Sequence, residues 1–431
     1  MPTDSKMNPI NAQTKIRLRR PPAGFSLVEL MVAMVIGVAA SLVIMQMFSV
    51  SEGRKRTSTS GADAQTNAAI ALYLMERDFR QAGLGLAPNT QDFVPPNTPP
   101  PAGVLTTGIL AQCSTVRAFK SDRASTPDYT YANSTFAPLV IDPPGFPAGD
   151  ANTNVILVNY SANNGIIGNG IAVSLSATTA QPGGDVPDYL ADSTRAGFKS
   201  GDMILAVPPN GTGLDCTLGE VTGLPGDPAP NGQCAPAIAG SVAAISHNNL
   251  AYKNFYGGCA SVNAVWNKGG AGVNYGPGSR LYNLGPSTGF VSRAYAVRNG
   301  SLTMCDMTAV DCTKTTATNA WIPIAPNIVA FSAQYGKDTD FNGTIDAWNT
   351  TAPANVGHAQ VVALRMVVVA RSDQYEKTAD FTATAPQWWN DAPGTTQVNL
   401  NISGSPDWER YRYKAAQTIV PLRNMMWGEQ K

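Results

Sequence analysis

The segment Gly24-Phe25-Ser26-Leu27-Val28-Glu29-Leu30 opens an apolar run that continues to about Phe48 and decides how the chain is organised. Residues 30–48 carry no charge, and at a rise of about 1.5 Å per residue a helix of this length spans a bilayer core of about 30 Å. Glu29 stands at the start of this run. Because a carboxylate at membrane depth is costly without a partner, we expect Glu29 to have a function.

Residues 1–24 are polar and basic, with the basic segment 15–20 and two prolines just before Ala23-Gly24. An ordinary secretory signal is cleaved after its apolar core, and residues 48–53 offer a poor site of that kind. That alternative also leaves Glu29 unexplained. The four basic residues of the segment 15–20 exceed the three at 54–56, which places the leader in the cytoplasm.

A helix is predicted to continue beyond the membrane, because residues 61–82 contain no proline and carry one apolar stripe at helical spacing. Gly83, Gly85 and Pro88 are stop signals, so we expect a single helix over 25–82. Its acidic and basic residues at 76–80 are interpreted as a solvated face. The stripe is Ala68, Leu72, Met75, Phe79 and Ala82, and the opposite side carries Gln65, Asn67, Glu76, Arg77 and Arg80.

Beyond residue 87 short apolar runs alternate with turn-forming residues, which is typical of strands in a loop-rich domain. Residues 210–236 are dense in Gly and Pro and are expected to form an ordered surface loop. The glycine pairs at 257–258 and 269–270 are expected in turns. The predicted strands are 155–158, 171–175, 203–207, 328–335, 361–371 and 418–422.

The composition fits an exported β-rich protein. The 431 residues have zero formal net charge, only 14% charged residues, 40 Gly and 32 Pro. A nucleic-acid-binding protein usually shows a basic surplus, so no nucleic-acid partner is expected. Two distant histidines, His247 and His358, and the absence of phosphate-loop or hydrolase motifs argue against an enzyme.

Six cysteines lie beyond the apolar run, and none shows the Cys-x-x-Cys spacing of a zinc or redox site. An even number in an exported domain indicates disulfides. Proximity favours Cys305 with Cys312 and Cys216 with Cys234, which leaves Cys113 with Cys259. Sequence alone allows the other pairings.

The segment 338–346 matches the first nine positions of a calcium loop, with Gly343 at position six. We expect calcium ligands from Asp338, Asp340, Asn342, Thr344 (through its carbonyl) and Asp346. Position twelve is Asn349 rather than the glutamate of an EF-hand, and no helices are expected on either side. We therefore expect a free-standing calcium loop. The alternative is a polar Asn-Gly hairpin without a metal.

The N-terminal stretch resembles the cleavage and methylation signal shared by type IV prepilins and pseudopilins. The chain is more closely similar to the PilW minor pilins in four places: the helix end at 77–83, the segment 334–340 with the loop after it, the strand 361–372, and the ending 411–424. Phe341 and the long Pro/Gly-rich middle depart from that pattern.

The resemblance implies cleavage between Gly24 and Phe25 by prepilin peptidase, and N-methylation of Phe25. It implies a pilin-like α+β fold, a long N-terminal transmembrane and amphipathic helix packed on an antiparallel β-sheet head with large loop-rich insertions. The expected parts are a leader 1–24, a membrane and assembly segment 25–50, an amphipathic segment 51–86, and a disulfide-containing head 87–431 whose PilW-like part begins near 250.

The implied function is a minor pilin that primes type IV pilus assembly and sits at the pilus tip, with roles in twitching motility and cell adhesion. Glu29 would pair with the α-amine of Phe25 on a neighbouring subunit or its own. The expected partners are other minor pilins, the major pilin, the inner-membrane assembly platform and a large tip adhesin. The head is expected in the periplasm before assembly and at the cell surface afterwards.

Two alternatives remain open. A type II secretion pseudopilin of the J kind shares the same N-terminal half. A membrane-anchored periplasmic binding protein or enzyme would instead keep residues 1–24.

Overall fold

The protein is described by a computed structural model. The described residues are 24, 26–86, 113, 116–118, 129–131, 137–162, 171–172, 188–190, 197–209, 212–229, 232–240, 243–267, 275, 278–314, 320–340, 342–353, 360–376, 382, 385–386, 388, 400, 402 and 407–426. Several features of the sequence analysis lie outside them: the leader residues 1–23, Phe25, Pro88, the strand residues 173–175, the glycine pair 269–270, Phe341 and His358.

One helix, α1 (Leu27–Phe79), opens the described chain and is 53 residues long. The chain divides into two compact units, Met1–Ser58 and Thr59–Lys431, so α1 contributes to both. The helix was predicted over 25–82, and its end falls three residues earlier, where turns begin that run to residue 86.

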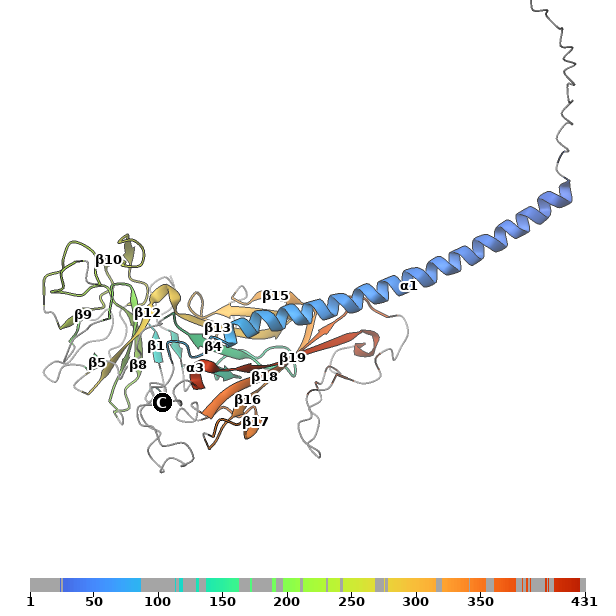
Figure 1. Cartoon of the computed structure of the whole chain (residues 1–431). Coiled ribbons are helices and arrows are strands. Elements are labelled where there is room, and N and C mark those ends of the chain that lie inside the picture. The colour runs from blue at the N-terminus through green and yellow to red at the C-terminus, as the bar shows by residue number, and fades with distance from the viewer. Residues whose placement is uncertain are drawn as a thin grey trace, which may run out of the picture. The chain divides into compact units, whose positions relative to one another are not determined.

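The described residues of the second unit form three main β-sheets and two small ribbons, many of whose strands are labelled in Figure 1. The five-stranded sheet has the order β15 (Ile322–Pro326), β14 (Ser301–Asp306), β13 (Val291–Arg298), β4 (Ile156–Tyr160) and β3 (Leu139–Ile141). The four-stranded sheet has the order β17 (Ala347–Asn349), β16 (Ile328–Lys337), β18 (Val361–Arg371) and β19 (Tyr413–Pro421). Both sheets are antiparallel throughout.

The six-stranded sheet has the order β2 (Tyr129–Tyr131), β1 (Val116–Ala118), β8 (Cys216–Glu220), β7 (Asp202–Val207), β12 (Arg280–Pro286) and β5 (Ile171–Ala172). It departs from the predicted antiparallel arrangement at one place, because β1 and β8 pair in parallel. The ribbons are β10 (Ala251–Lys253) with β11 (Ser261–Asn263), and β6 (Asp188–Leu190) with β9 (Ala244–Ser246). The short helices are η1 (Ser287–Gly289), η3 (Trp408–Arg410) and α3 (Arg423–Met426).

Most predicted strands are present. The strand 361–371 coincides with β18, and 155–158, 203–207 and 328–335 fall on β4, β7 and β16 with boundary shifts of one or two residues. The strand predicted at 418–422 begins five residues earlier, as β19. The described residues 257–258 lie in a turn, as expected.

The loop predicted over 210–236 is wrong in its central part. Residues Cys216–Glu220 form β8, a strand inside the six-stranded sheet whose residues are all buried. The segment Cys-Thr-Leu-Gly-Glu has a single large apolar side chain and sits among glycines and prolines, so local composition indicates a loop. Pairing with β1 and β7 on its two edges overrides that tendency.

The strand β4 is buried on both faces and joins two hydrophobic cores. Ile156 and Val158 belong to the core shared with the helix and the four-stranded sheet. Leu157, on the opposite face, belongs to a second core with β7, β8 and β12 of the six-stranded sheet. The five-stranded sheet is therefore the middle layer of the head, and every residue of its strands β3 and β4 is buried.

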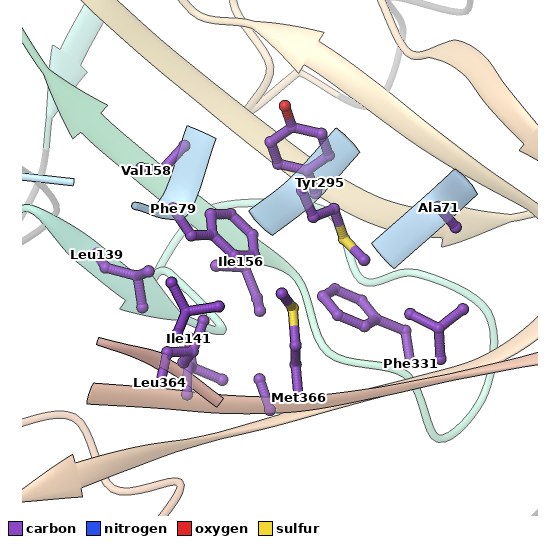
Figure 2. Close-up of a cluster of buried hydrophobic side chains, with 14 of the residues drawn as sticks. Ala71, Phe79, Leu139, Ile141, Ile156, Val158, Tyr295, Phe331, Leu364 and Met366 are labelled. Atoms are coloured by element: carbon purple, nitrogen blue, oxygen red, sulfur yellow. The ribbon is translucent and has the colours of Figure 1, made fainter. Parts of the chain in front are cut away.

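The predicted apolar stripe of the helix is buried against the first core. Ala68, Met75, Phe79 and Ala82 are at most 1% exposed, and Leu72 packs at the edge of the cluster. Figure 2 shows Ala71 and Phe79 from the helix directed into the same space as Leu364 and Met366 from β18. Phe79 also meets the ring of Tyr295 edge to face, with ring centroids 5.5 Å apart.

Asp78 corrects the expectation of a solvated helix face at 76–80. Its side chain is 1% exposed, and Oδ2 accepts hydrogen bonds from Arg293 Nη1 at 2.9 Å and from the Tyr295 hydroxyl at 2.7 Å. Asp78 lies three residues after Met75 and four before Ala82, which places it on the buried stripe. The expected pairing of opposite charges along the helix is found for Glu76 and the exposed Arg80, whose side-chain atoms are 2.5 Å apart.

The chain turns back after the helix at two glycines with positive φ, at +78° for Gly83 and +71° for Gly85. A Cβ atom on Gly83 would lie 2.9 Å from Met425 Sδ, and one on Gly85 would lie 2.8 Å from Ser161 Cβ. The Gly83 N–H donates to the Asn159 carbonyl at 3.0 Å, which joins the helix end to β4. Both glycines are therefore required by backbone conformation and by close packing.

Three disulfides are present, and one of the three favoured pairings is correct. Cys305 pairs with Cys312, as predicted. The pairings of Cys216 with Cys234 and of Cys113 with Cys259 are wrong, because Cys113 pairs with Cys216 and Cys234 with Cys259. The parallel pairing of β1 with β8 sets Val116 opposite Cys216, which brings Cys113 close to it across 103 residues of sequence.

Breaking the contact of Asp78 with Arg293 should destabilise the head far more than breaking the nearby ion pair of Glu76 with Arg80. In Asp78→Asn the Arg293 guanidinium loses its buried anion, and we expect the free energy of unfolding to fall by about 3 kcal/mol. The matched control Glu76→Gln removes an exposed pair and should cost about 0.5 kcal/mol. Denaturant unfolding of the full chain in detergent measures both. Equal losses would contradict the structural role given to Asp78.

His247 should make the head sensitive to mild acid. It is fully buried, and burial lowers the pKa of its imidazole from 6.5 to about 3. The unfolded chain takes up this proton as the pH falls below 6.5, but the folded chain does not, so stability falls by about 1.4 kcal/mol per pH unit down to the folded-state pKa. His247→Gln should show a shallower decline between about pH 6.5 and pH 4 in denaturant titrations. Parallel declines in the two proteins would disprove this.

Candidate functional site

The beginning of α1 forms a helix cap from residues of the predicted processing signal. Ser26 precedes the first helical residue, Leu27, and Glu29 Oε2 accepts a hydrogen bond from the Ser26 N–H at 3.4 Å. This is the reciprocal half of a Ser-x-x-Glu capping box, in which a glutamate in the first turn satisfies an orphan backbone donor. Gly24 and Glu29 are both exposed in the single chain, so the carboxylate remains accessible to a further partner.

The first unit consists of an apolar helical segment whose side chains have no covering protein among the described residues. A window of 18 residues in α1 reaches a mean hydropathy of 2.5, none of it buried, which is long and apolar enough to cross a membrane. A helix that is apolar all round requires lipid or other helices around it. The exposed large side chains between 27 and 50 include Leu30, Val35, Leu42, Met45 and Phe48.

In the second unit, the segments that resemble PilW proteins converge at the helix end. Asn424 Nδ2 donates to the carbonyl oxygens of Arg80 at 3.4 Å and Ala82 at 3.3 Å. Leu422 N–H donates to the Val362 carbonyl at 2.9 Å, so the C-terminal ending is held by β18 as well as by the helix end. Met425 joins the first core. The three segments form one packed unit, although Asn424 lies more than 340 residues after the helix end in the chain.

The predicted calcium loop lies between β16 and β17, held at both ends by backbone hydrogen bonds. Asp338 N–H donates to the Gln360 carbonyl at 2.9 Å, and Asp346 N–H donates to the Lys337 carbonyl at 2.8 Å. Gly343, at φ +85°, takes the turn that only glycine adopts easily. Asp338 is fully buried, and its carboxylate accepts the N–H groups of Asn342 at 3.1 Å and Gly343 at 2.7 Å.

Three of the five predicted ligand residues come together. Asp338, Asp340 and Asp346 each offer one carboxylate oxygen, and these atoms lie within 4.8 Å of one another. The Thr339 hydroxyl and N–H both donate to Asp346 Oδ2 at 2.7 Å, which lowers the pKa of that exposed carboxyl. The loop therefore gathers negatively charged oxygens, the ligands that calcium prefers.

The other predicted ligands are tied to their neighbours in the loop. Asn342 Nδ2 donates to Asp340 Oδ2 at 2.9 Å, and the Thr344 N–H donates to Asn342 Oδ1 at 2.8 Å. Asn349 occupies position twelve, in β17. Its buried side-chain oxygen has no hydrogen-bond partner among the described residues. Phe341, the departure from the family pattern, lies outside the described residues.

Sequence reasoning missed the buried polar contact of Asp78 with Arg293 and Tyr295. The available signal was the position of Asp78 on the same helical stripe as Met75 and Ala82. Nothing in the local sequence marks Arg293 as its partner, because 215 residues separate the two.

Comparisons with known proteins match the N-terminal segment and the C-terminal part of the head. Residues 294–424 match the family model for the type IV pilus-assembly protein W, and residues 19–45 match the prokaryotic N-terminal methylation motif. A type IV-like pilin from Thermus thermophilus is 16% identical over 32% of this chain and 70% of its own, with a TM-score of 0.20. No curated protein matches the chain.

The processing motif, the long apolar helix and the antiparallel sheets together define a type IV pilin-like protein. Residues 294–424, from within β13 to the start of α3, form its PilW domain. The match begins at residue 294, within β13. All the described strands of the six-stranded sheet therefore lie before the PilW domain in the sequence.

Proposed function

We propose that this protein is a minor pilin that primes assembly of a type IV pilus and sits at the fibre tip. The observation that supports this most directly is the pairing of an uncovered apolar helix with a head that carries a PilW domain. The helix supplies the surface that pilins share, and burying it among similar helices is strongly favourable. The head is much larger than the PilW domain, which suits a terminal position without neighbours above it.

Processing and register would depend on three residues of the N-terminal stretch. Prepilin peptidase cleaves between Gly24 and Phe25, which leaves Phe25 as a methylated amine with a positive charge. Glu29 then pairs with this amine on a neighbouring subunit or its own. In a bundle that excludes water, the pair offsets the desolvation of both charges and fixes the axial stagger of the helices.

The proposed partners and location follow from the same assignment. Before assembly the protein spans the inner membrane once, with its head in the periplasm, and afterwards it is carried to the cell surface. Its helix contacts other minor pilins, the major pilin and the assembly platform, and its head contacts a large tip adhesin. The protein acts structurally and not as an enzyme.

Two competing functions make different predictions. A J-like pseudopilin would serve secretion and leave piliation intact, and the PilW match favours the pilus. An anchored binding protein or enzyme would keep its leader, and the methylation motif favours cleavage.

We further propose that the loop 338–346 binds calcium. Three carboxylates within 4.8 Å repel one another, and a divalent cation would relieve that repulsion. The buried Asp338 would provide the fixed ligand, with Asp340 and Asp346 closing on the ion from the exposed side. Asn342 and the Thr344 carbonyl are the further oxygen ligands that the loop offers it.

Loss of the Glu29 charge should abolish assembly without preventing processing. A deletion strain carrying Glu29→Leu should show few or no surface pili and normal protein secretion, whereas the matched control Glu52→Gln, an exposed glutamate on the same helix, should restore pili. Electron microscopy and secretion assays measure these outcomes.

N-terminal mass analysis of the membrane-bound protein completes this test. It should find methylated Phe25 as the first residue in the wild-type and Glu29→Leu proteins. Unchanged piliation with lost secretion in the deletion strain would support the pseudopilin instead. An intact Met1 would support the anchored protein.

Removal of one loop carboxylate should lower the melting temperature only when calcium is present. Calcium should raise the melting temperature of the wild-type full chain in detergent, and Asp340→Ala should remove that increase because a ligand is lost. The control Asp63→Ala, an exposed aspartate on α1, should keep it. Equal melting of the wild-type protein with calcium and with a chelator would disprove the calcium site.

A further inference from the structure

An open pocket of about 400 Å³ lies in the head, mainly in the part of the chain that precedes the PilW domain. Its walls come from β8, β10, β11, η1 and the segments that follow β10, β11, η1 and β14. The residues that carry its chemistry are Glu220, Tyr252, Asn254, Trp266, Ser287 and Phe290.

Glu220, at the end of β8, is the only charged residue among the described residues that line the pocket, and it is 3% exposed. Oε1 accepts the hydroxyls of Tyr252 at 2.5 Å and Ser287 at 2.9 Å, and Oε2 accepts the Val265 N–H at 2.9 Å. These donors hold the carboxylate in one place. Asn267 fixes the backbone beneath it, accepting the Glu220 N–H and donating to the Glu220 carbonyl, both at 2.7 Å.

The charge of Glu220 has no cationic partner among the described residues. All its donors are neutral, and burial together with the neighbouring carboxylate raises the pKa of the Tyr252 hydroxyl, so Tyr252 remains protonated. The adjacent Lys253 directs its Nζ to the Ala235 carbonyl at 2.9 Å. A buried carboxylate with only neutral donors is stabilised further by any cation that can reach it.

Aromatic side chains line the same pocket as this carboxylate. Trp266 and Phe290 meet edge to face, with ring centroids 6.1 Å apart, and both line the pocket together with Tyr252. Aromatic rings next to an anion are the combination that recognises organic cations, because the rings attract positive charge and accommodate the attached carbon chain. A small metal ion would gain nothing from those rings.

We propose that this pocket binds an alkylammonium group, either the side chain of a lysine on a partner protein or a free primary amine. The ammonium would donate hydrogen bonds to the Glu220 carboxylate, and the alkyl chain would pack against Trp266 and Phe290. A fixed carboxylate, aromatic side chains and room for a few carbon atoms are present together at this pocket. The proposal is independent of the fibre assignment.

Saturation-transfer NMR on the full chain in a non-ionic detergent tests it with n-butylammonium and the neutral analogue 1-butanol. We expect binding of n-butylammonium and at least about tenfold weaker binding of 1-butanol, because a hydrogen bond to a charged group is lost. Glu220→Gln should weaken the binding of n-butylammonium by a similar factor, and the control Glu76→Gln should leave it unchanged. Equal binding of the two probes, or unchanged binding by Glu220→Gln, would overturn the proposal.

A second variant keeps the test decisive if Glu220→Gln fails to fold. Thr288 is exposed on the pocket rim and does not contact the carboxylate through any described bond. Thr288→Trp should therefore block the binding of n-butylammonium with an unchanged melting temperature.

Binding of a neutral sugar such as glucose in place of the cation would also overturn the proposal. Competition by an exposed-lysine peptide would identify a protein partner, and its failure while n-butylammonium binds would identify a free amine; both outcomes support the alkylammonium site.

Discussion

The contact of Asp78 with Arg293 and Tyr295 is the constraint on which the head depends. A carboxylate that is 1% exposed is tolerated only where hydrogen bonds and an opposite charge offset its desolvation, and β13 supplies both. Because both donors come from one strand, this contact fixes the axial position and the rotation of the helix end on the middle sheet. Phe79 and Met75 enter the first core in the arrangement that this position allows.

The middle sheet then determines how the rest of the head is built. Its strand β4 contributes to the core under the helix with one face and to the core of the six-stranded sheet with the other. The part of the head within the PilW match and the part that precedes it therefore share one layer. This arrangement separates the roles of the chain: the apolar half of α1 is equipped for contacts common to pilins, while the six-stranded sheet and the pocket at Glu220 belong to this head.

Features encoded by local pattern were predictable from the sequence. The eleven apolar-rich residues of β18 and the clustered carboxylates of the loop 338–346 need only neighbouring residues to specify them, so strand propensity and the spacing of the acidic residues were sufficient. The strand β8 and the pairing of Cys113 with Cys216 were not predictable, because each depends on a partner about 100 residues away. Proximity in the chain is a good guide to pairing only for a short separation such as that of Cys305 and Cys312.

By itself the sequence determined the processing signal, the membrane-length helix, its buried stripe and the family of the C-terminal domain, since all of these depend on spacing within short segments. Only the tertiary structure decided that Asp78 is a buried anchor and not a surface charge. It also decided which cysteines pair and that Glu220 lies in an aromatic pocket. The physical reason is the same in each case: burial and charge pairing depend on residues that meet only after distant strands have joined.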